Sequence, residues 1–198
     1  MPAVPTEGGW QRRRRRSTLV VAPVLLVVLS ATAGANAVPR PAACKGSSLR
    51  PTRKDIARVT AATLCLIDRE RSAYKLGPLR ANSSLQGIAA GQAKAMVVGD
   101  YFGDDSPSGT TPWQRIAASA YAAGAHSIAA AQNIGWGTSK MATPAGMVGI
   151  WMHSPPHREI VLTSGYRDIG IGVAPAAPTS LTKGASGATY TVEFATRG

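Results

Sequence analysis

Two histidines in one short segment have types and spacing that could do chemistry. His153 and His157 lie four positions apart, a spacing that lets two imidazoles on one helix bind the same metal ion. Pro155 and Pro156 fall between them, and a proline removes a backbone donor and pushes the preceding residue out of the helical region. We therefore predict that one helix ends near Ser154 and that a second begins at the prolines, with Ser154 as its N-cap.

The predicted break places His157 near a helix N-terminus, where the helix dipole disfavours an imidazolium. A neutral ring can bind a metal or transfer a proton. The alternative is that His157 only packs and forms hydrogen bonds. No other catalytic pattern competes, because the chain contains no G-x-S-x-G elbow, phosphate loop or H-E-x-x-H motif.

The first 37 residues have the features of an export signal. Five arginines at 12–16 precede an apolar run at 19–29 and an A-x-A site that ends at Ala37. We predict a signal peptide cleaved after Ala37, and hence a secreted, extracellular protein. The alternative is an uncleaved membrane anchor, although the apolar run is short for a span of about 20 residues.

The charge of the mature chain bears on its partners. Removing residues 1–37 takes away five arginines and Glu7, so the formal net charge falls from +12 to +8. An anionic cell envelope or lipid surface could attract such a chain. The remaining basic residues are scattered without interleaved aromatic residues, so we expect a solvated basic surface and no nucleic-acid binding.

Cys44 and Cys65 are the only two cysteines. Export favours an oxidised pair, so we predict a disulfide between them. Closing this loop would stabilise the fold by about 3 kcal/mol in the loop-entropy model.

Residue periodicity predicts helices first and strands last. Residues 38–55 form an extended lead-in to one domain at 56–198, in which we expect helices over residues 53–74 and 83–98, from Pro112, and from Pro144. Capping boxes are predicted at Ser83–Gln86 and Thr111–Gln114. Strands are expected over 132–136, 168–173 and 190–194, the last two as an antiparallel hairpin with a long loop. The fold class is therefore α+β, with helices covering a small antiparallel sheet.

Two more structural predictions follow from these strands and helices. Gly170 and Gly172 alternate along one face of a strand, so another element should approach that backbone closely. The periodicity of apolar residues in the expected helices and strands also predicts which residues form the core. They are Trp113, Trp151, Ile169, Ile171, Val192 and Phe194.

Several motifs occur together in a fixed order. They are Leu64–Arg71, Tyr101–Asp104, Ser106–Gly109, Thr111–Trp113, Gln132–Ile134, Trp151–Arg158 and Ile169–Val173. In these motifs the chain resembles the CAP superfamily of cysteine-rich secretory proteins, antigen 5 and pathogenesis-related proteins of group 1, in its bacterial secreted, SCP-like branch. The resemblance implies an α-β-α sandwich. It also implies an open cleft where two histidines and two acidic residues meet and, in some members, hold a divalent metal.

The chain departs from this family pattern at the cleft. Asp104 stands where the first histidine is expected, and Gln132 replaces a carboxylate. His157 alone matches its family residue, while His153 stands where bacterial members often carry a polar residue. The resemblance places Asp104, Gln132, His153 and His157 at the binding cleft, with His157 facing Asp104 and Gln132.

These departures predict poor metal chemistry. His157 and Asp104 are the candidate metal ligands, and zinc prefers more nitrogen and sulfur donors than they supply. Asp105 or an inward-facing His153 could assist. An amide takes up no proton near neutrality, so Gln132 cannot act as a general base. Gln132 and Asn133 could instead simply begin a hydrogen-bonded strand.

The sequence therefore favours a secreted, non-catalytic CAP domain that binds a lipid or cell-envelope ligand, as a monomer without a cofactor. One alternative is a secreted metal-dependent hydrolase that uses His157 and Asp104 around a divalent ion. Another is a structural protein tethered to the membrane by its uncleaved signal segment. Fold resemblance by itself does not establish activity.

Overall fold

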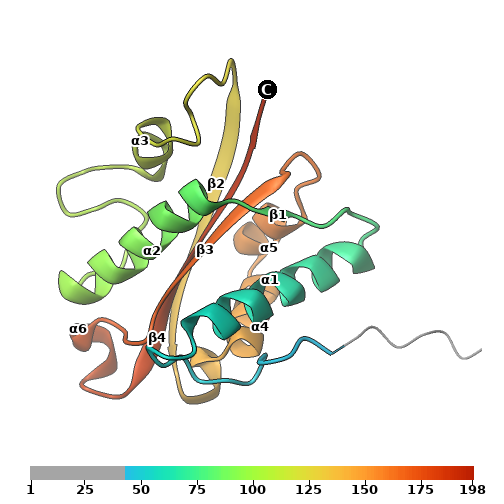
Figure 1. Cartoon of the computed structure of the whole chain (residues 1–198). Coiled ribbons are helices and arrows are strands. Elements are labelled where there is room, and N and C mark those ends of the chain that lie inside the picture. Colours follow the sequence, from blue (N-terminus) through green and yellow to red (C-terminus); the bar gives the residue numbers. More distant parts are fainter. Residues whose placement is uncertain (1–42) are drawn as a thin grey trace, which may run out of the picture. The chain divides into compact units, whose positions relative to one another are not determined.

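A computed structural model describes residues 43–198, so the predicted signal peptide and the start of the lead-in lie outside the described residues. The elements along the chain are α1 (Ile56–Ala73), β1 (Arg80–Ala81), α2 (Ser83–Val98), α3 (Pro112–Ala117), β2 (Ile128–Thr138), η1 (Ser139–Ala142), α4 (Pro144–His153), α5 (Pro155–Leu162), β3 (Asp168–Ala174), α6 (Thr179–Thr182) and β4 (Gly187–Arg197) (Figure 1). In this part of the chain, no helix has both the length and the apolar character needed to cross a membrane.

The sheet has the order β1-β3-β4-β2. β4 pairs antiparallel with both β2 and β3, and Ile171 lies opposite Val192 in the predicted hairpin. β1 is two residues long and pairs parallel with β3, so the sheet is mixed and not wholly antiparallel as expected. β2 spans eleven residues, whereas the sequence predicted only 132–136.

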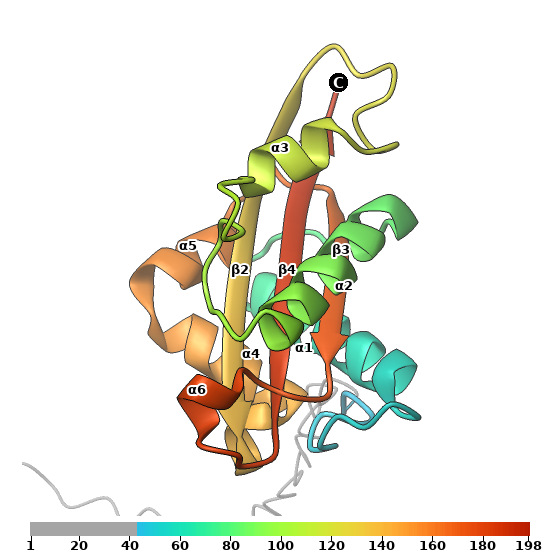
Figure 2. The same cartoon turned by 90° about the vertical axis from the view of Figure 1, so that its left-hand side faces the viewer.

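Helices cover both faces of the sheet, which confirms the α-β-α sandwich. α2 and α3 lie on one face, and α1, α4 and α5 lie on the other (Figure 2). A Cβ atom added to Gly170 or Gly172 would lie 2.1 Å from the backbone of Leu85 or Ala89 in α2. The predicted close approach to these glycines is therefore the packing of α2 on β3.

The main core contains five of the six predicted residues. Trp151, Ile169, Ile171, Val192 and Phe194 are at most 4% exposed. The prediction for Trp113 is wrong, because its side chain is 52% exposed. α3 has only six residues, and Ile116 in its last turn makes the packing contact with Leu85 and Tyr121.

Side-chain caps mark the starts of α2, α3 and α4, whereas α1 and α5 have none. Thr111 and Gln114 form both hydrogen bonds of the predicted capping box at α3. At α2 the prediction is corrected, because the Asn82 side chain, one residue earlier, accepts from the backbone of Ser84 and Leu85. The predicted break at Ser154 is confirmed, with α4 ending at His153 and α5 beginning at Pro155.

A disulfide joins Cys44 to Cys65, as predicted, and ties the lead-in to α1. We expect the double variant Cys44→Ala/Cys65→Ala to lose about 3 kcal/mol of unfolding free energy, since the open chain gains entropy when unfolded. Urea denaturation measures this loss. Dithiothreitol should lower the midpoint of the wild type and leave that of the variant unchanged. A loss below about 1 kcal/mol would contradict the expectation.

Candidate functional site

Asp104 lies in the loop between α2 and α3. Hydrogen bonds from one side chain of each helix hold this loop in place. Gln92 of α2 donates to the backbone oxygens of Gly103 (3.0 Å) and Asp104 (3.3 Å). Arg115 of α3 donates to the same Asp104 oxygen over 2.7 Å. The exposed Asp104 carboxylate is thus presented from an anchored loop.

Gln132 of β2 uses both ends of its amide. Its Nε2 donates to Asp104 Oδ1 over 2.9 Å, and its Oε1 accepts from Arg115 over 3.1 Å. The structure therefore brings Asp104 and Gln132 together, as the family pattern predicted. The third member of the group is Arg115, which the sequence did not single out.

Arg115 joins three segments of the chain through one guanidinium group. Besides Asp104 and Gln132, it donates to the backbone oxygen of Thr110 over 2.8 Å. The capping box of α3 begins at the next residue, Thr111, so the start of this helix and its arginine are fixed together. A permanent positive charge therefore lies at the centre of the candidate site.

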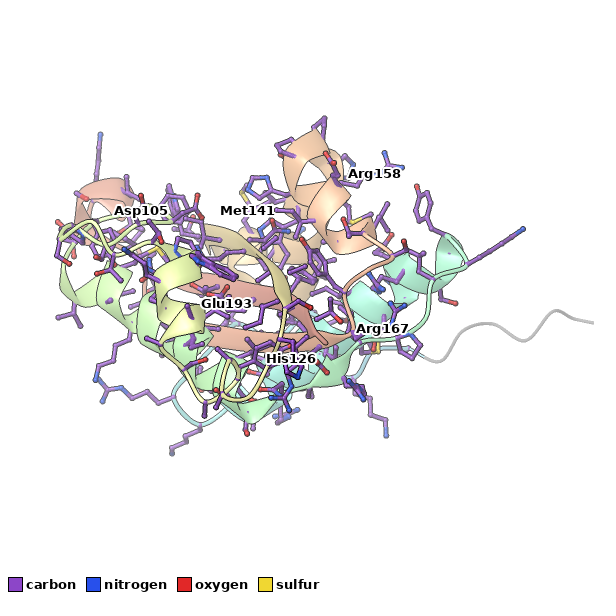
Figure 3. The ribbon with its side chains drawn as sticks, turned by 90° about the horizontal axis from the view of Figure 1, so that it is seen from above. Asp105, His126, Met141, Arg158, Arg167 and Glu193 are labelled. Atoms are coloured by element: carbon purple, nitrogen blue, oxygen red, sulfur yellow. A yellow bond between two sulfur atoms is a disulfide. The ribbon has the colours of Figure 1, made fainter. Side chains whose placement is uncertain are left out.

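Glu193 lies beside this group, inside the molecule. It is opposite Gln132 in the β2–β4 pairing and opposite Gly170 in the β3–β4 pairing, and its side chain is 0% exposed. Figure 3 shows it within the fold, while Asp105 and Arg158 lie at the periphery. Burial raises the pKa of Glu193 to about 8, the charge of Arg115 lowers it, and that of Asp104 raises it.

His157 is held by a separate set of contacts. Its Nδ1 lies 2.7 Å from Ser154 Oγ, which explains why the Ser154 side chain makes no capping bond to the backbone of α5. Its backbone oxygen accepts from the Asn133 amide over 3.0 Å. Within residues 43–198, no hydrogen bond or ion pair joins His157 to Asp104 or Gln132.

The alternation of β2 explains this separation. Successive side chains of a strand point to opposite faces. Gln132 accepts from Arg115 of α3, and Asn133 donates to the backbone oxygen of His157 in α5. α3 and α5 lie on opposite faces of the sheet (Figure 2). A cleft shared by His157 and Asp104 would have to pass around the edge of β2, and the prediction that they face one another stays a prediction.

His153 lies at the end of α4 on the outside of the molecule. Its exposed ring hydrogen-bonds through Nδ1 to the Gly149 backbone oxygen at 2.7 Å. It lines a shallow hollow with residues of α4 and α5, including Arg158 and Glu159. None of Asp104, Gln132 and His157 lines this hollow.

The chemistry of the group follows from its donors and acceptors. Asp104 and Gln132 are already hydrogen-bonded, and Gln132 offers no base. In the part of the chain that the structure describes, no three His, Cys, Asp or Glu side chains cluster as metal ligands. A divalent metal would also meet the charge of Arg115, so the residues present do not fit the metal that the family implies.

Sequence reasoning assigned no partner to two acidic residues that the structure buries, Asp168 and Glu193. Asp168 is 7% exposed, pairs with Arg80 over 3.0 Å and accepts from the Tyr121 hydroxyl over 2.9 Å. Glu193 is the other such residue. The sequence could have predicted their burial. Helices expected on both faces of a sheet imply that polar residues on either face are buried. For Arg115 no sequence signal existed, since a lone arginine on a short helix is usually solvated.

Comparisons with known proteins agree with this architecture. The family model described as "Cysteine-rich secretory protein family" matches residues 64–192. No curated protein matches the chain.

Several solved structures share the fold. An outer surface protein from Borrelia burgdorferi is 21% identical with a TM-score of 0.53, and the match covers 67% of this chain and 88% of that one. An extracellular protein containing an SCP domain from Bacillus anthracis is 22% identical, with a TM-score of 0.51 over 71% of this chain. A cysteine-rich secretory protein from Staphylococcus aureus is 18% identical, with a TM-score of 0.51 over 72%.

The match spans only 40% of the length of each of the latter two proteins, so what they share with this chain is one domain. The motif order, the α-β-α sandwich and the match over residues 64–192 agree, and the chain belongs to the cysteine-rich secretory protein (CAP) family.

Proposed function

We propose that this chain is an exported, non-catalytic CAP domain that binds the acyl chain of a lipid or of a lipid-bearing cell-envelope component. The observation that carries the proposal is an apolar groove of about 280 Å³ along the outer edge of β3. Its lining consists of Ala57, Thr60, Ala61, Leu64, Ala81, Gln86, Ile169 and Ile171.

The groove exists because β1 is short. β1 pairs only with Asp168 and Ile169, so from Gly170 onwards β3 has no neighbouring strand on that side among the described residues. α1 passes this edge and lines the groove with Ala57, Ala61 and Leu64, which follow helical spacing; the two alanines are exposed there. The result is an apolar slot between two helices, which suits a narrow hydrocarbon chain better than a bulky substrate.

The lining supports this ligand class. It contains two polar side chains, Thr60 and Gln86, and no charged one. Ligand sites are typically concave and mostly apolar with a few polar groups. The formal charge of +8 on residues 38–198 suits an anionic headgroup outside the groove.

Export is the other half of the proposal. Residues 1–37 read as a signal peptide, a disulfide is present, and the neighbours in fold are described as outer surface, extracellular and secretory proteins. Sequencing the N-terminus of protein recovered from culture medium tests this: a mature chain that starts at Val38 supports it, and one that retains residues 1–37 favours the membrane-tethered alternative.

Filling the groove should weaken binding of an acyl chain. Ala61 lies on the groove wall, and we expect Ala61→Trp to weaken binding of a fluorescent fatty acid by at least about tenfold, because the indole occupies the slot. Fluorescence titration of the folded variants measures the affinity.

Ala90→Trp is the matched control. Ala90 is exposed on α2 and does not line the groove, so this variant should bind within about twofold of the wild type. Equal affinities for the two variants, or no binding by the wild type, would overturn the acyl-chain proposal.

A further inference from the structure

A second cavity lies at the end of the sheet where β3 ends and β4 begins, and its volume is about 440 Å³. We call it the basic pocket, and its lining consists of residues 50–53, Ala142, Pro175, Ser186 and Gly187. Arg50 and Arg53 are the charged residues of this lining, which includes no acidic residue. The pocket is therefore positively charged, unlike the apolar groove.

The fold gathers positive charge around the basic pocket from three segments. Residues 43–54, 139–142 and 175–187 contain no Asp or Glu, and their basic residues are Lys45, Arg50, Arg53, Lys54, Lys140 and Lys183. Among the described residues, two acidic side chains hydrogen-bond to these segments: Asp55 accepts from Thr52, and Asp100 accepts from Ser180. Basic residues that are scattered along the sequence thus lie on segments that meet at one end of the molecule, where they attract anions.

The two arginines of the pocket are available to an anion. Both are exposed, and within residues 43–198 neither guanidinium group takes part in a hydrogen bond or an ion pair. Their backbone is fixed, because Leu49 packs against the core and the Asp55 amide donates to the Thr52 backbone oxygen over 3.0 Å. A guanidinium group binds carboxylate and phosphate through two parallel hydrogen bonds, so an oxyanion is the ligand that suits this wall.

The basic pocket continues the line of the apolar groove. Ala57 of α1 and Ile171 of β3 line opposite walls of the groove. Arg53 precedes Ala57 by four positions, Pro175 follows Ile171 by four, and both line the basic pocket. The start of α1 lies beside the end of β3 (Figures 1 and 2), so the same two segments lead from one cavity to the other. Four residues of a strand span about 13 Å.

We infer that the basic pocket binds the oxyanionic headgroup, a phosphate or a carboxylate, of the acyl ligand whose hydrocarbon chain lies in the groove. Arg50 and Arg53 bind the headgroup through charge-assisted hydrogen bonds. The ligand is then an anionic lipid that lies along α1 with its head at the start of the helix. This inference rests on the proposed acyl-chain binding and adds to it the charge of the ligand and its direction in the groove.

The test compares decyl phosphate with uncharged decanol by isothermal titration calorimetry. Arg50→Gln/Arg53→Gln should bind decyl phosphate at least about tenfold more weakly than the wild type, because it loses the charged donors. The same variant should bind decanol within about twofold of the wild type, because the groove is unchanged. Both positions are exposed and make no side-chain hydrogen bond within residues 43–198, so the variant should remain folded.

Lys75→Gln/Lys94→Gln is the matched control, since it also removes two positive charges. Both lysines are exposed, and neither lines the groove or the basic pocket. This control should bind decyl phosphate within about twofold of the wild type. An equal loss of affinity in the two double variants would show that only net charge matters, and would overturn the inference.

The remaining outcomes separate the inference from the acyl-chain proposal. Equal decyl phosphate affinities for the wild type and Arg50→Gln/Arg53→Gln overturn the headgroup site alone, provided that decanol still binds and Ala61→Trp weakens it. Inorganic phosphate that binds as tightly as decyl phosphate would identify a site for free phosphate and overturn the lipid headgroup. If neither decyl ligand binds the wild type, the acyl-chain proposal fails, and this inference fails with it.

Discussion

Glu193→Gln should remove a large pH dependence from the stability of this protein. The pKa of Glu193 is raised from its ordinary value of 4.5 to about 8, chiefly by burial. A raised acid pKa means that the folded state retains a proton that the unfolded chain releases. The contribution of protonated Glu193 to the unfolding free energy is fully present below about pH 4.5. It is lost as the pH rises towards 8.

The size of the effect follows from linkage. At 1.36 kcal/mol for each unit, the loss between the two pKa values amounts to about 3–5 kcal/mol of unfolding free energy. Glutamine cannot ionise, so the variant should lack this component and should gain on the wild type as the pH rises from 5 to 9.

Urea denaturation at a series of pH values measures the difference between the two proteins. Other carboxylates contribute equally to both, so the difference isolates Glu193. The charged groups that face it are Arg115 from α3 and Asp104 from the preceding loop. Glu159→Gln, at an exposed position on α5, is the matched control and should leave the pH profile unchanged. Parallel profiles for wild type and Glu193→Gln would show that Glu193 is not protonated by burial.

Trp151→Ala is expected to cost about 3–5 kcal/mol of unfolding free energy, because a fully buried indole is replaced by a cavity. The indole also donates through Nε1 to the backbone oxygen of Ile134 over 3.0 Å. It packs edge-on against Tyr190, with ring centroids 6.4 Å apart. Loss of Trp151 therefore leaves a buried acceptor without its donor and removes an aromatic contact.

Trp113→Ala is the natural comparison, because it makes the same substitution at a side chain that is 52% exposed. Its cost should stay below about 1 kcal/mol, the usual range for surface positions. Denaturant unfolding of both variants gives the two values. Similar costs for the two tryptophans would mean that Trp151 does not anchor the core.

The group of Asp104, Gln132 and Arg115 lies at the β2 edge of the sheet, and the apolar groove lies at the β3 edge. In this group, the Asp104 carboxylate accepts from Gln132, and the Gln132 amide accepts from Arg115. Hydrogen bonds therefore occupy the side chains that a hydrolase would need free. At the far edge of the sheet, the short β1 leaves an apolar slot. The proposed acyl-chain binding therefore lies at the β3 edge, away from the polar group at the β2 edge.

Local chemistry made much of the fold predictable from the sequence. Proline geometry alone places the break between α4 and α5 at Ser154. Thr111 and Gln114 mark the start of α3 through their capping box. The alternation of Ile169 and Ile171 gives the face of β3 that joins the main core, and the glycine face is covered by α2. These features depend on neighbours along the chain, so the sequence determined them by itself.

The site depended on contacts between segments far apart in the chain. Glu193 is followed at once by apolar Phe194, but its own burial results from the packing of α2 and α3 over its face of the sheet. Arg115 reaches Gln132 across 17 positions and Asp104 across 11. His157 was predicted correctly as a residue near a helix start. Its partners and those of Gln132 could not be predicted, because they depend on which face of the sheet each side chain of β2 meets. Tertiary packing sets the environment of a charge and its partners, because both depend on distances that local spacing does not define.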